Sequence, residues 1–292
     1  MKNRGLRFDP RIQFAMLALP GAAFVFVFLV LPLLSIVVFS FWRTERYELI
    51  PEWNLENYRI VLTDPTYLTF LLRSLVMATV VCLVSVVYAW PVAYFIAKHG
   101  GRYRLVLVLL TAAPFLTGIV LRVTALQQIL GPIGLINMAL MTFGFEPIEA
   151  LMYSNVASAI GLVYLWIPFM IVAIYLSLLN FDFELLEVAK VAGARPWRAF
   201  LEVTWPLNWI GTAIGIVLVF VPTFAATVTP RFLGGPNGSL FGNILEHQFG
   251  ATGTWALGSA MGVVLFLVSL AFILLIGRTI DPKRTGFTGI GR

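Results

Sequence analysis

Few residues in this 292-residue sequence are of types and spacing that could do chemistry. The two histidines, His99 and His247, stand far apart, and Cys82 is the one cysteine, so no metal-ligand cluster forms and no disulfide within the chain is possible. The four lysines follow Met, Ala, Ala and Pro, and none follows the glycine that a phosphate-binding loop needs. We therefore expect no catalysis and no nucleotide site in this chain.

Recognition by another protein is the chemistry that fits residues 185–206. The pattern predicts two short helices, because 185–192 are good helix formers, Gly193 allows a left-handed terminating residue, and Pro196 suits the first position of a second helix. Pro206 marks where that second helix gives way to the next apolar block.

A small-residue face is expected on the first of these helices. Ala189 and Gly193 are four residues apart and share a face, so another protein's backbone can approach closely, and Glu187 supplies a charge beside it. The alternative is an ordinary hairpin tucked under a helical bundle.

The elements that position this hairpin are apolar blocks. The chain is 60% hydrophobic and 12% charged, with a mean hydropathy of +0.91, which leaves too little polar surface for a water-soluble globule of its size. Each block is longer than the roughly 20 helical residues that are needed to cross a bilayer. The blocks are 14–42, 71–97, 105–126, 152–179, 207–229 and 256–277. We predict an all-α integral membrane protein with six transmembrane helices.

Charge sets the expected orientation. Fourteen of the 20 Lys and Arg residues fall in the N-terminal tail, the C-terminal tail and the loops 98–104 and 180–206. Positive charge is retained in the cytoplasm, so both termini and the hairpin are predicted to be cytoplasmic. The expected organisation is a tail at 1–13, a six-helix membrane domain at 14–279 and a tail at 280–292. The net charge of +6 forms no continuous basic face, so no nucleic-acid partner is expected.

The connections on the other face are predicted from their turn formers and polarity. Residues 43–70 form a polar connection, and 131–150 is too short and too broken by Gly and Pro to span, so it is expected as a short interfacial helix. Asp64 directly before Pro65, like Asp9 before Pro10, predicts a helix start.

The hairpin resembles the EAA motif of ABC importer permeases, E-A-A-x3-G-x9-I-x-L-P. Glu187, Ala189, Gly193 and Pro206 stand at the pattern's spacing, while Val188, Val203 and Trp205 replace its second alanine, its isoleucine and its leucine. The resemblance implies a type I ABC importer permease fold in a bacterial inner membrane. It also implies partners, namely a second permease subunit that is identical or a paralogue, a cytoplasmic ATPase dimer that binds ATP and Mg, and an extracytoplasmic substrate-binding protein.

Along nearly the whole chain the sequence is most similar to spermidine/putrescine-type permeases. The stretches that carry this likeness are 55–58, 114–122, 161–170 and 228–235. That branch also handles opines and aminophosphonates. Polyamine permeases often carry an acid where this chain has Arg231, and none of the six blocks contains Asp or Glu.

Candidates for the solute pathway are polar and aromatic residues in the middle or outer halves of blocks three to five and in the loop after the fifth block. They are Phe115, Arg122, Tyr164, Trp166, Thr223, Thr227 and Arg231. Ordinary helix packing is the alternative for each. As a set they favour a small organic solute with an anionic group that Arg122 or Arg231 meets. A channel or secondary transporter without an ATPase is the alternative function, and it should show intramembrane ionisable residues, to which only Arg122 comes close.

Overall fold

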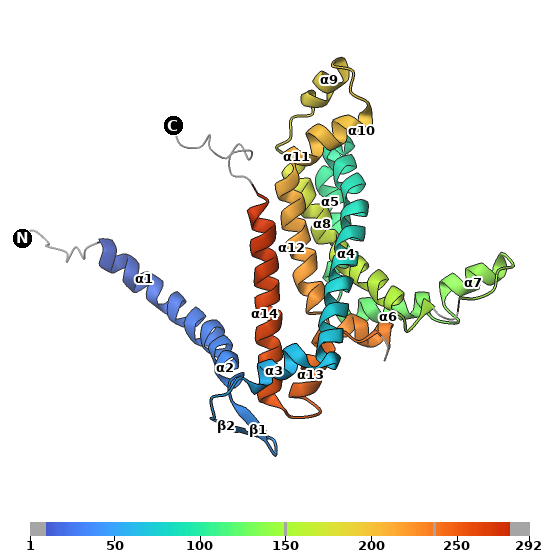
Figure 1. Ribbon diagram of the computed structural model, residues 1–292. Coiled ribbons are helices and arrows are strands. Elements are labelled where there is room, and N and C mark those ends of the chain that lie inside the picture. The colour runs from blue at the N-terminus through green and yellow to red at the C-terminus, as the bar shows by residue number, and fades with distance from the viewer. Residues whose placement is uncertain (1–9, 149–150, 236–237, 281–292) are drawn as a thin grey trace, which may run out of the picture. The chain divides into compact units, whose positions relative to one another are not determined.

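The structure is a computed structural model that describes residues 10–148, 151–235 and 238–280. Most of the two predicted tails, 1–13 and 280–292, lies outside the described residues. The rest divides into two compact units, Met1–Asp64 with Gln248–Val264 and Pro65–His247 with Leu265–Arg292. Figure 1 shows that most of the described residues are helical, as predicted.

The first unit holds a helical segment, a β-hairpin and a short helix. In chain order its elements are α1 (Pro10–Val25), a π-helical turn η1 (Phe26–Val30), α2 (Leu31–Phe39), β1 (Arg43–Glu45), β2 (Glu48–Ile50) and α3 (Glu56–Thr63). The first part of α14 (Trp255–Arg278) also belongs here.

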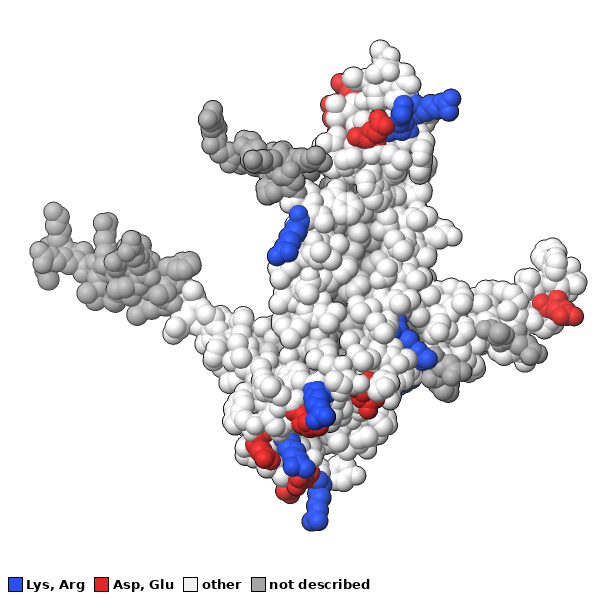
Figure 2. All heavy atoms as spheres, viewed as in Figure 1, with Lys and Arg blue, Asp and Glu red and all other residues white. Residues whose placement is uncertain are grey.

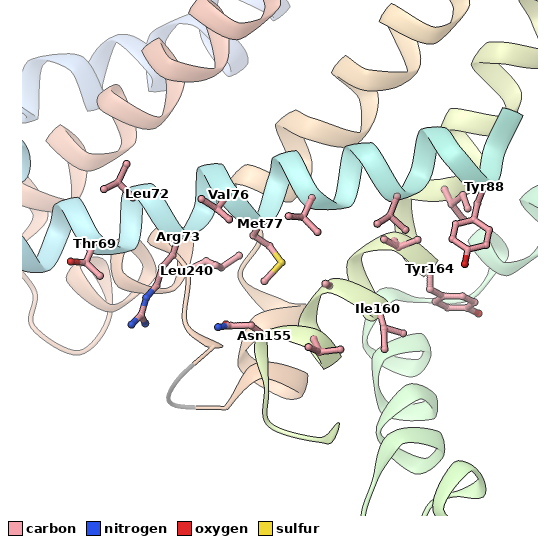
Figure 3. Close-up of a pocket in the computed structure, with 16 residues that line it drawn as sticks. Thr69, Leu72, Arg73, Val76, Met77, Tyr88, Asn155, Ile160, Tyr164 and Leu240 are labelled. Carbon is pink, nitrogen blue, oxygen red and sulfur yellow. The ribbon is translucent and has the colours of Figure 1, made fainter. Parts of the chain in front are cut away.

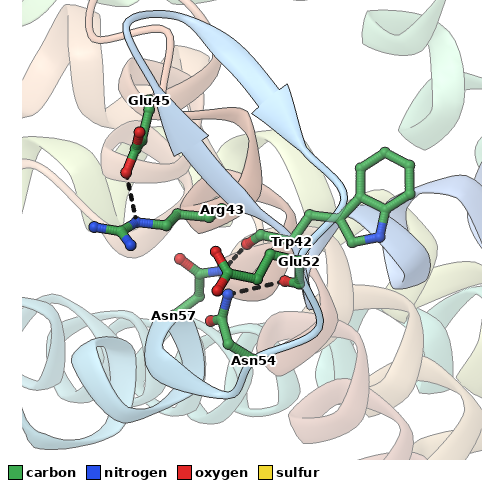
Figure 4. Close-up of polar contacts among 6 residues, drawn as sticks. All are labelled: Trp42, Arg43, Glu45, Glu52, Asn54 and Asn57. Carbon is green, nitrogen blue, oxygen red and sulfur yellow. Dashed lines mark hydrogen bonds and ion pairs between the residues drawn. The ribbon is translucent and has the colours of Figure 1, made fainter.

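Within the polar connection predicted at 43–70, the structure has a β-hairpin, α3 and the start of α4. β1 and β2 pair antiparallel with Arg43 opposite Ile50, and Arg46 and Tyr47 adopt φ of 47° and 70°, as a tight two-residue hairpin turn requires. Figure 4 shows how polar contacts fix this region: Arg43 pairs with Glu45 at 3.1 Å, and the Asn57 amide donates to the Trp42 carbonyl at 2.7 Å.

The second unit holds the remaining elements. They are α4 (Pro65–His99), η2 (Gly101–Tyr103), α5 (Arg104–Ala112), η3 (Ala113–Leu116), α6 (Ile119–Leu130), α7 (Leu135–Thr142), α8 (Asn155–Leu178), α9 (Glu184–Val191), α10 (Pro196–Ala199), η5 (Phe200–Thr204), α11 (Trp205–Leu207), α12 (Trp209–Phe224), η6 (Pro230–Gly234) and α13 (Phe241–Phe249), which crosses into the first unit at its end. As predicted, α4 begins at Pro65.

The core of the second unit is the contact among α4, α8 and α12. Glycines let the backbones approach, since a Cβ at Gly211 of α12 would overlap Ser177 of α8 and lie 2.7 Å from the Ala173 carbonyl oxygen. A Cβ at Gly161 of α8 would likewise meet Leu233 and Thr229. Close approach through small residues is how helices gain contact in lipid, where burial from water contributes little.

Within the described residues, five helices are long and apolar enough to cross a membrane, or six if one bent pair counts as a single span. The five are Ala18–Phe39, Pro65–His99, Ile119–Thr142, Asn155–Leu178 and Trp255–Arg278, and the bent pair is Pro196–Leu207 with Trp209–Phe224.

The predicted helix over 105–126 is wrong as a single element. α5 ends at Ala112, a 3₁₀ turn follows, and α6 begins only at Ile119. Pro114 removes a backbone donor and Gly118 is extended at φ −61° and ψ 149°, so the helical ladder is interrupted twice within a few residues. The long apolar stretch begins later, at α6, and takes in α7, the short helix predicted within 131–150.

Candidate coupling hairpin and solute groove

The segment from α9 to α11 is the helix–turn–helix predicted from the sequence. At the end of α9, Gly193 has φ +83°, its N–H donates to the Lys190 carbonyl at 2.9 Å, and the Ala194 N–H donates to the Ala189 carbonyl at 2.9 Å. These two bonds are the Schellman arrangement, which closes the helix with a left-handed glycine. The turn is therefore set by the backbone rather than by side-chain packing, and a Cβ at Gly193 would meet nothing within 4 Å.

The second half of the hairpin starts at Pro196 and runs into α12 through a break. Arg195 is extended at ψ 150°, and the helix that follows includes one π turn before α11. Pro206 lies exposed in the first turn of α11, and the chain bends by 72° at Asn208, two residues beyond it. The Asn208 side chain stabilises the bend by donating to the Thr204 carbonyl at 2.9 Å and accepting from Ser177 at 3.1 Å.

Glu187 lies exposed on α9, and Ala189 is half-buried. The Lys190 ammonium donates to the Glu187 carboxylate at 2.8 Å, and this hydrogen bond with its charge lowers the pKa of Glu187. The depressed pKa means that the carboxylate stays ionised through the neutral range and is protonated only as the pH falls through that lowered value.

The hairpin also presents apolar side chains that the motif did not single out. Val188, Val191 and Trp197 are 65%, 91% and 70% exposed. Figure 2 shows acidic and basic side chains over this same hairpin, with uncharged surface over the helices that lead away from it. Large exposed apolar residues beside charges are typical of a protein-binding surface. Nothing in the sequence indicated that these three apolar side chains would be exposed.

The loop 98–104 lies at the same end of the second unit as the hairpin. The Lys98 ammonium donates to the Tyr94 hydroxyl at 3.2 Å and lies 6.0 Å from the centre of the Phe183 ring, just before α9. Two of the four segments predicted to be cytoplasmic therefore share one end.

Three of the predicted pathway residues form one cluster of rings around a cation. The Arg122 guanidinium lies 4.7 Å from the centre of the Phe115 ring, and Phe115 lies 6.5 Å from Trp166, centre to centre. Phe169, which the sequence reasoning missed, meets Phe115 edge-on at 4.6 Å. Arg122 is 8% exposed, and its Nε and one Nη have no hydrogen-bond partner among the described residues.

Tyr164 lies elsewhere, in a groove of about 1010 Å³ between α4 and α8. Figure 3 shows Tyr164 beside Tyr88 at one end of this groove and Arg73 with Asn155 at the other. Leu, Ile, Val, Ala and Met side chains line most of the rest, and the described residues that line it include no carboxylate. A solute in this groove would meet two phenol rings at one end, Arg73 and Asn155 at the other, and a largely apolar wall between them.

The last three predicted pathway residues line neither the groove nor the ring cluster. Thr223 is fully buried in α12, and the Thr227 carbonyl accepts from the Asn243 amide at 2.7 Å. Arg231 pairs with Glu246 of α13 at 3.1 Å. Of the seven residues proposed from the sequence, three thus form the ring cluster, one lines the groove and three lie in neither.

Residues 89–286 match the family described as binding-protein-dependent transport system inner membrane component. The chain is 32% identical to the spermidine/putrescine transport system permease protein PotB of Escherichia coli strain K12 over 86% of its length and 92% of the relative's. It is 28% identical to the inner membrane ABC transporter permease protein YdcU of the same strain, over 78% and 77%.

Solved structures agree on the fold. A bacterial alginate ABC transporter, crystallised in complex with an alginate pentasaccharide-bound periplasmic protein, superposes with a TM-score of 0.71 at 16% identity, over 92% of this chain and 93% of the other. The family match covers more than half of the chain, and the relatives are transport permeases rather than enzymes. The chain therefore belongs to the family of binding-protein-dependent transport system inner membrane components, as a non-catalytic permease subunit of an ABC importer in the inner membrane.

Proposed function

We propose that this chain forms half of a solute pathway and couples it to separate cytoplasmic ATPase subunits through residues 185–206. The observation that carries the proposal is the hairpin itself, a rigid Schellman-closed turn that presents Glu187 and exposed apolar side chains away from the bundle. ATP and Mg bind to the ATPase pair. Closure of the ATPase pair moves the hairpin. A second permease subunit completes the solute pathway.

The extracytoplasmic substrate-binding protein is the further partner in this proposal. The family's description names dependence on a binding protein, and the alginate transporter was crystallised with a periplasmic protein. An importer of this kind is tested by reconstituting the permease pair with its ATPase in lipid vesicles. Solute-loaded binding protein is expected to stimulate ATP hydrolysis, and an unaltered rate would contradict the proposal.

Orientation is tested by chemical labelling. A cysteine at Glu146, exposed beyond α7, is expected to react with a membrane-impermeant thiol reagent added outside intact spheroplasts, whereas a cysteine at Ala194 is expected to react only after lysis. Cys82 is buried and supplies little background. The reverse labelling pattern would invert the proposed topology.

For the solute, we propose a small organic molecule that carries at least one anionic group, such as a carboxylate or phosphonate. Arg122 supports this, because a buried guanidinium with two unpartnered nitrogens gains most from an anion that can take both. A polyamine is the second candidate, favoured by what the PotB relatives are named for. In the groove a polyamine would be held by cation–π attraction to the rings of Tyr88 and Tyr164.

Titration of the cognate binding protein separates the two candidates. Calorimetry with spermidine, putrescine and a panel of amino-acid-like and phosphonate solutes is expected to show tight binding of an anionic member. Tight binding of an unmodified polyamine, with no response to the anionic panel, would reject the anionic solute and leave the importer itself intact.

A further inference from the structure

The coupling hairpin packs on α4, the helix that lines the groove, at the buried side chain of Trp90. Trp90 is 4% exposed and its ring stacks on Trp205 of α11, with centres 5.3 Å apart and planes 28° apart. Phe200 meets the same ring edge-on at 5.2 Å. Trp90 also donates through Nε1 to the Thr212 hydroxyl of α12 at 3.2 Å. We call Trp90, Phe200 and Trp205 the aromatic clasp.

The π turn at Phe200–Thr204 is what lets the hairpin form this clasp. In a regular α-helix, residues five apart lie about 140° apart around the axis, so Phe200 and Trp205 would face different neighbours. Here the Trp205 N–H donates to the Phe200 carbonyl, the wider hydrogen-bonding pattern of a π turn, and the two rings lie 6.2 Å apart. Both rings therefore meet Trp90.

Trp90 stands at the place where α4 bends most easily. Pro91 follows it inside the helix and has no N–H to give to the Val87 carbonyl, so one turn of the ladder lacks a bond. Tyr88, two residues before Trp90, lines the groove and is shown beside Tyr164 in Figure 3. Force applied at the Trp90 ring thus acts within one turn of a groove residue.

We propose that the aromatic clasp is the link that converts movement of the coupling hairpin into bending of α4 at Pro91, and so opens and closes the groove at Tyr88 and Tyr164. The link rests on the proposed coupling function of the hairpin. Trp90 acts in it as a positioning residue, because it touches the hairpin and moves the groove, and it does not need to touch the solute.

The measurement is the number of ATP molecules hydrolysed per solute imported by the complete reconstituted complex. Trp90→Ala is expected to raise this ratio about tenfold, in the range typical of a lost coupling between sites. Trp205→Leu leaves an apolar contact and is expected to raise it less. Combining the two should add little to Trp90→Ala alone, because both remove one contact.

Phe272→Ala is the matched control. It removes another stacked pair of the second unit, in which the Phe272 and Phe220 rings lie 3.6 Å apart and which includes no residue of the clasp. A structural effect would lower hydrolysis and uptake together in all variants and leave the ratio at its wild-type value. That result for Trp90→Ala overturns the proposal.

Two possible failures of this experiment have separate interpretations. If the Trp90→Ala protein does not accumulate, Trp90→Phe and Trp205→Leu serve as the test variants, since each keeps a large apolar group. A wild-type number of ATP molecules hydrolysed per solute in both variants rejects the proposed role of the clasp. If the wild-type complex itself shows no stimulation by the binding protein, the proposed coupling function fails, and that failure is distinct from a wild-type ratio in the variants.

Discussion

Gly193→Trp is expected to abolish binding-protein-stimulated uptake while leaving the protein inserted and folded. The turn is open, since a Cβ at Gly193 would meet nothing within 4 Å, so an indole fits within this chain. A side chain at φ +83° costs about 1–2 kcal/mol, which a large membrane protein tolerates. The indole would instead fill the surface that an ATPase subunit must approach. Uptake and ATP hydrolysis in reconstituted vesicles measure the loss.

Gly144→Trp is the matched control for that experiment. Gly144 has φ +81° and nothing within 4 Å of a Cβ, so its backbone strain and open surroundings equal those of Gly193. It lies after α7, at the far side of the unit from the hairpin, and near-normal uptake is expected. Equal losses in both variants would mean that strain, not docking, causes the effect.

Glu187→Arg completes the test by changing charge instead of bulk. The substitution breaks the contact with Lys190 and places two cations on adjacent turns of α9. It is expected to uncouple hydrolysis from transport, whereas Glu187→Gln, which keeps the shape, should do so less. Normal stimulated hydrolysis and normal uptake in Glu187→Arg would remove this residue from the coupling surface.

Gly211→Leu is expected to have the largest effect on stability. The added side chain would collide with Ser177 and with the backbone of α8 at Ala173, and neither can move without separating α12 from α8. Overpacking of a tight core costs about 1–3 kcal/mol and more when backbone must shift. Thermal unfolding of the purified protein, followed by size-exclusion fluorescence, should show a large drop in the midpoint or no folded protein.

Gly277→Leu provides the comparison for this substitution. Gly277 is also helical, near the end of α14, and a Cβ there meets nothing within 4 Å. Its unfolding midpoint is expected to match that of the wild type within a few degrees, or to rise because glycine is a poor helix former. A stable Gly211→Leu protein would contradict the packing of α8 on α12.

The hairpin could be predicted from sequence because its signals are local. A left-handed glycine and a proline at a first helical position each act within a few residues, and the structure has a turn at Gly193 and a helix start at Pro196, as those residue types require. The π turn could not be predicted, since no local residue type indicates it and the ring that Phe200 and Trp205 both contact lies more than a hundred positions earlier.

The third apolar block shows where hydropathy alone fails. A window average over 105–126 is insensitive to a break at Pro114 and Gly118, although both residues were visible in the sequence. The hydropathy average reports how apolar a stretch is. The missing backbone donor at Pro114 and the extended conformation of Gly118 decide where the helix ends.

The sequence indicated only some of the positions of the seven candidate pathway residues. Tyr164 and Trp166 are two positions apart on α8, so they lie on different faces, and only Tyr164 reaches the groove. Helical periodicity could have separated them. The partner of Arg231 could not be found in this way, because Glu246 lies on another element and is not at helical spacing.

The Arg231–Glu246 pair has a consequence for the ionic-strength dependence of transport. With both side chains about half exposed and 3.1 Å apart, the pair presents a small dipole to the surrounding solution instead of a net cation. At physiological salt the Debye length is about 8 Å, so little of that field extends to an approaching charged molecule. A solute is thus neither drawn in nor repelled at this point, and varying the salt concentration should leave the contribution of this pair to the rate of entry nearly constant.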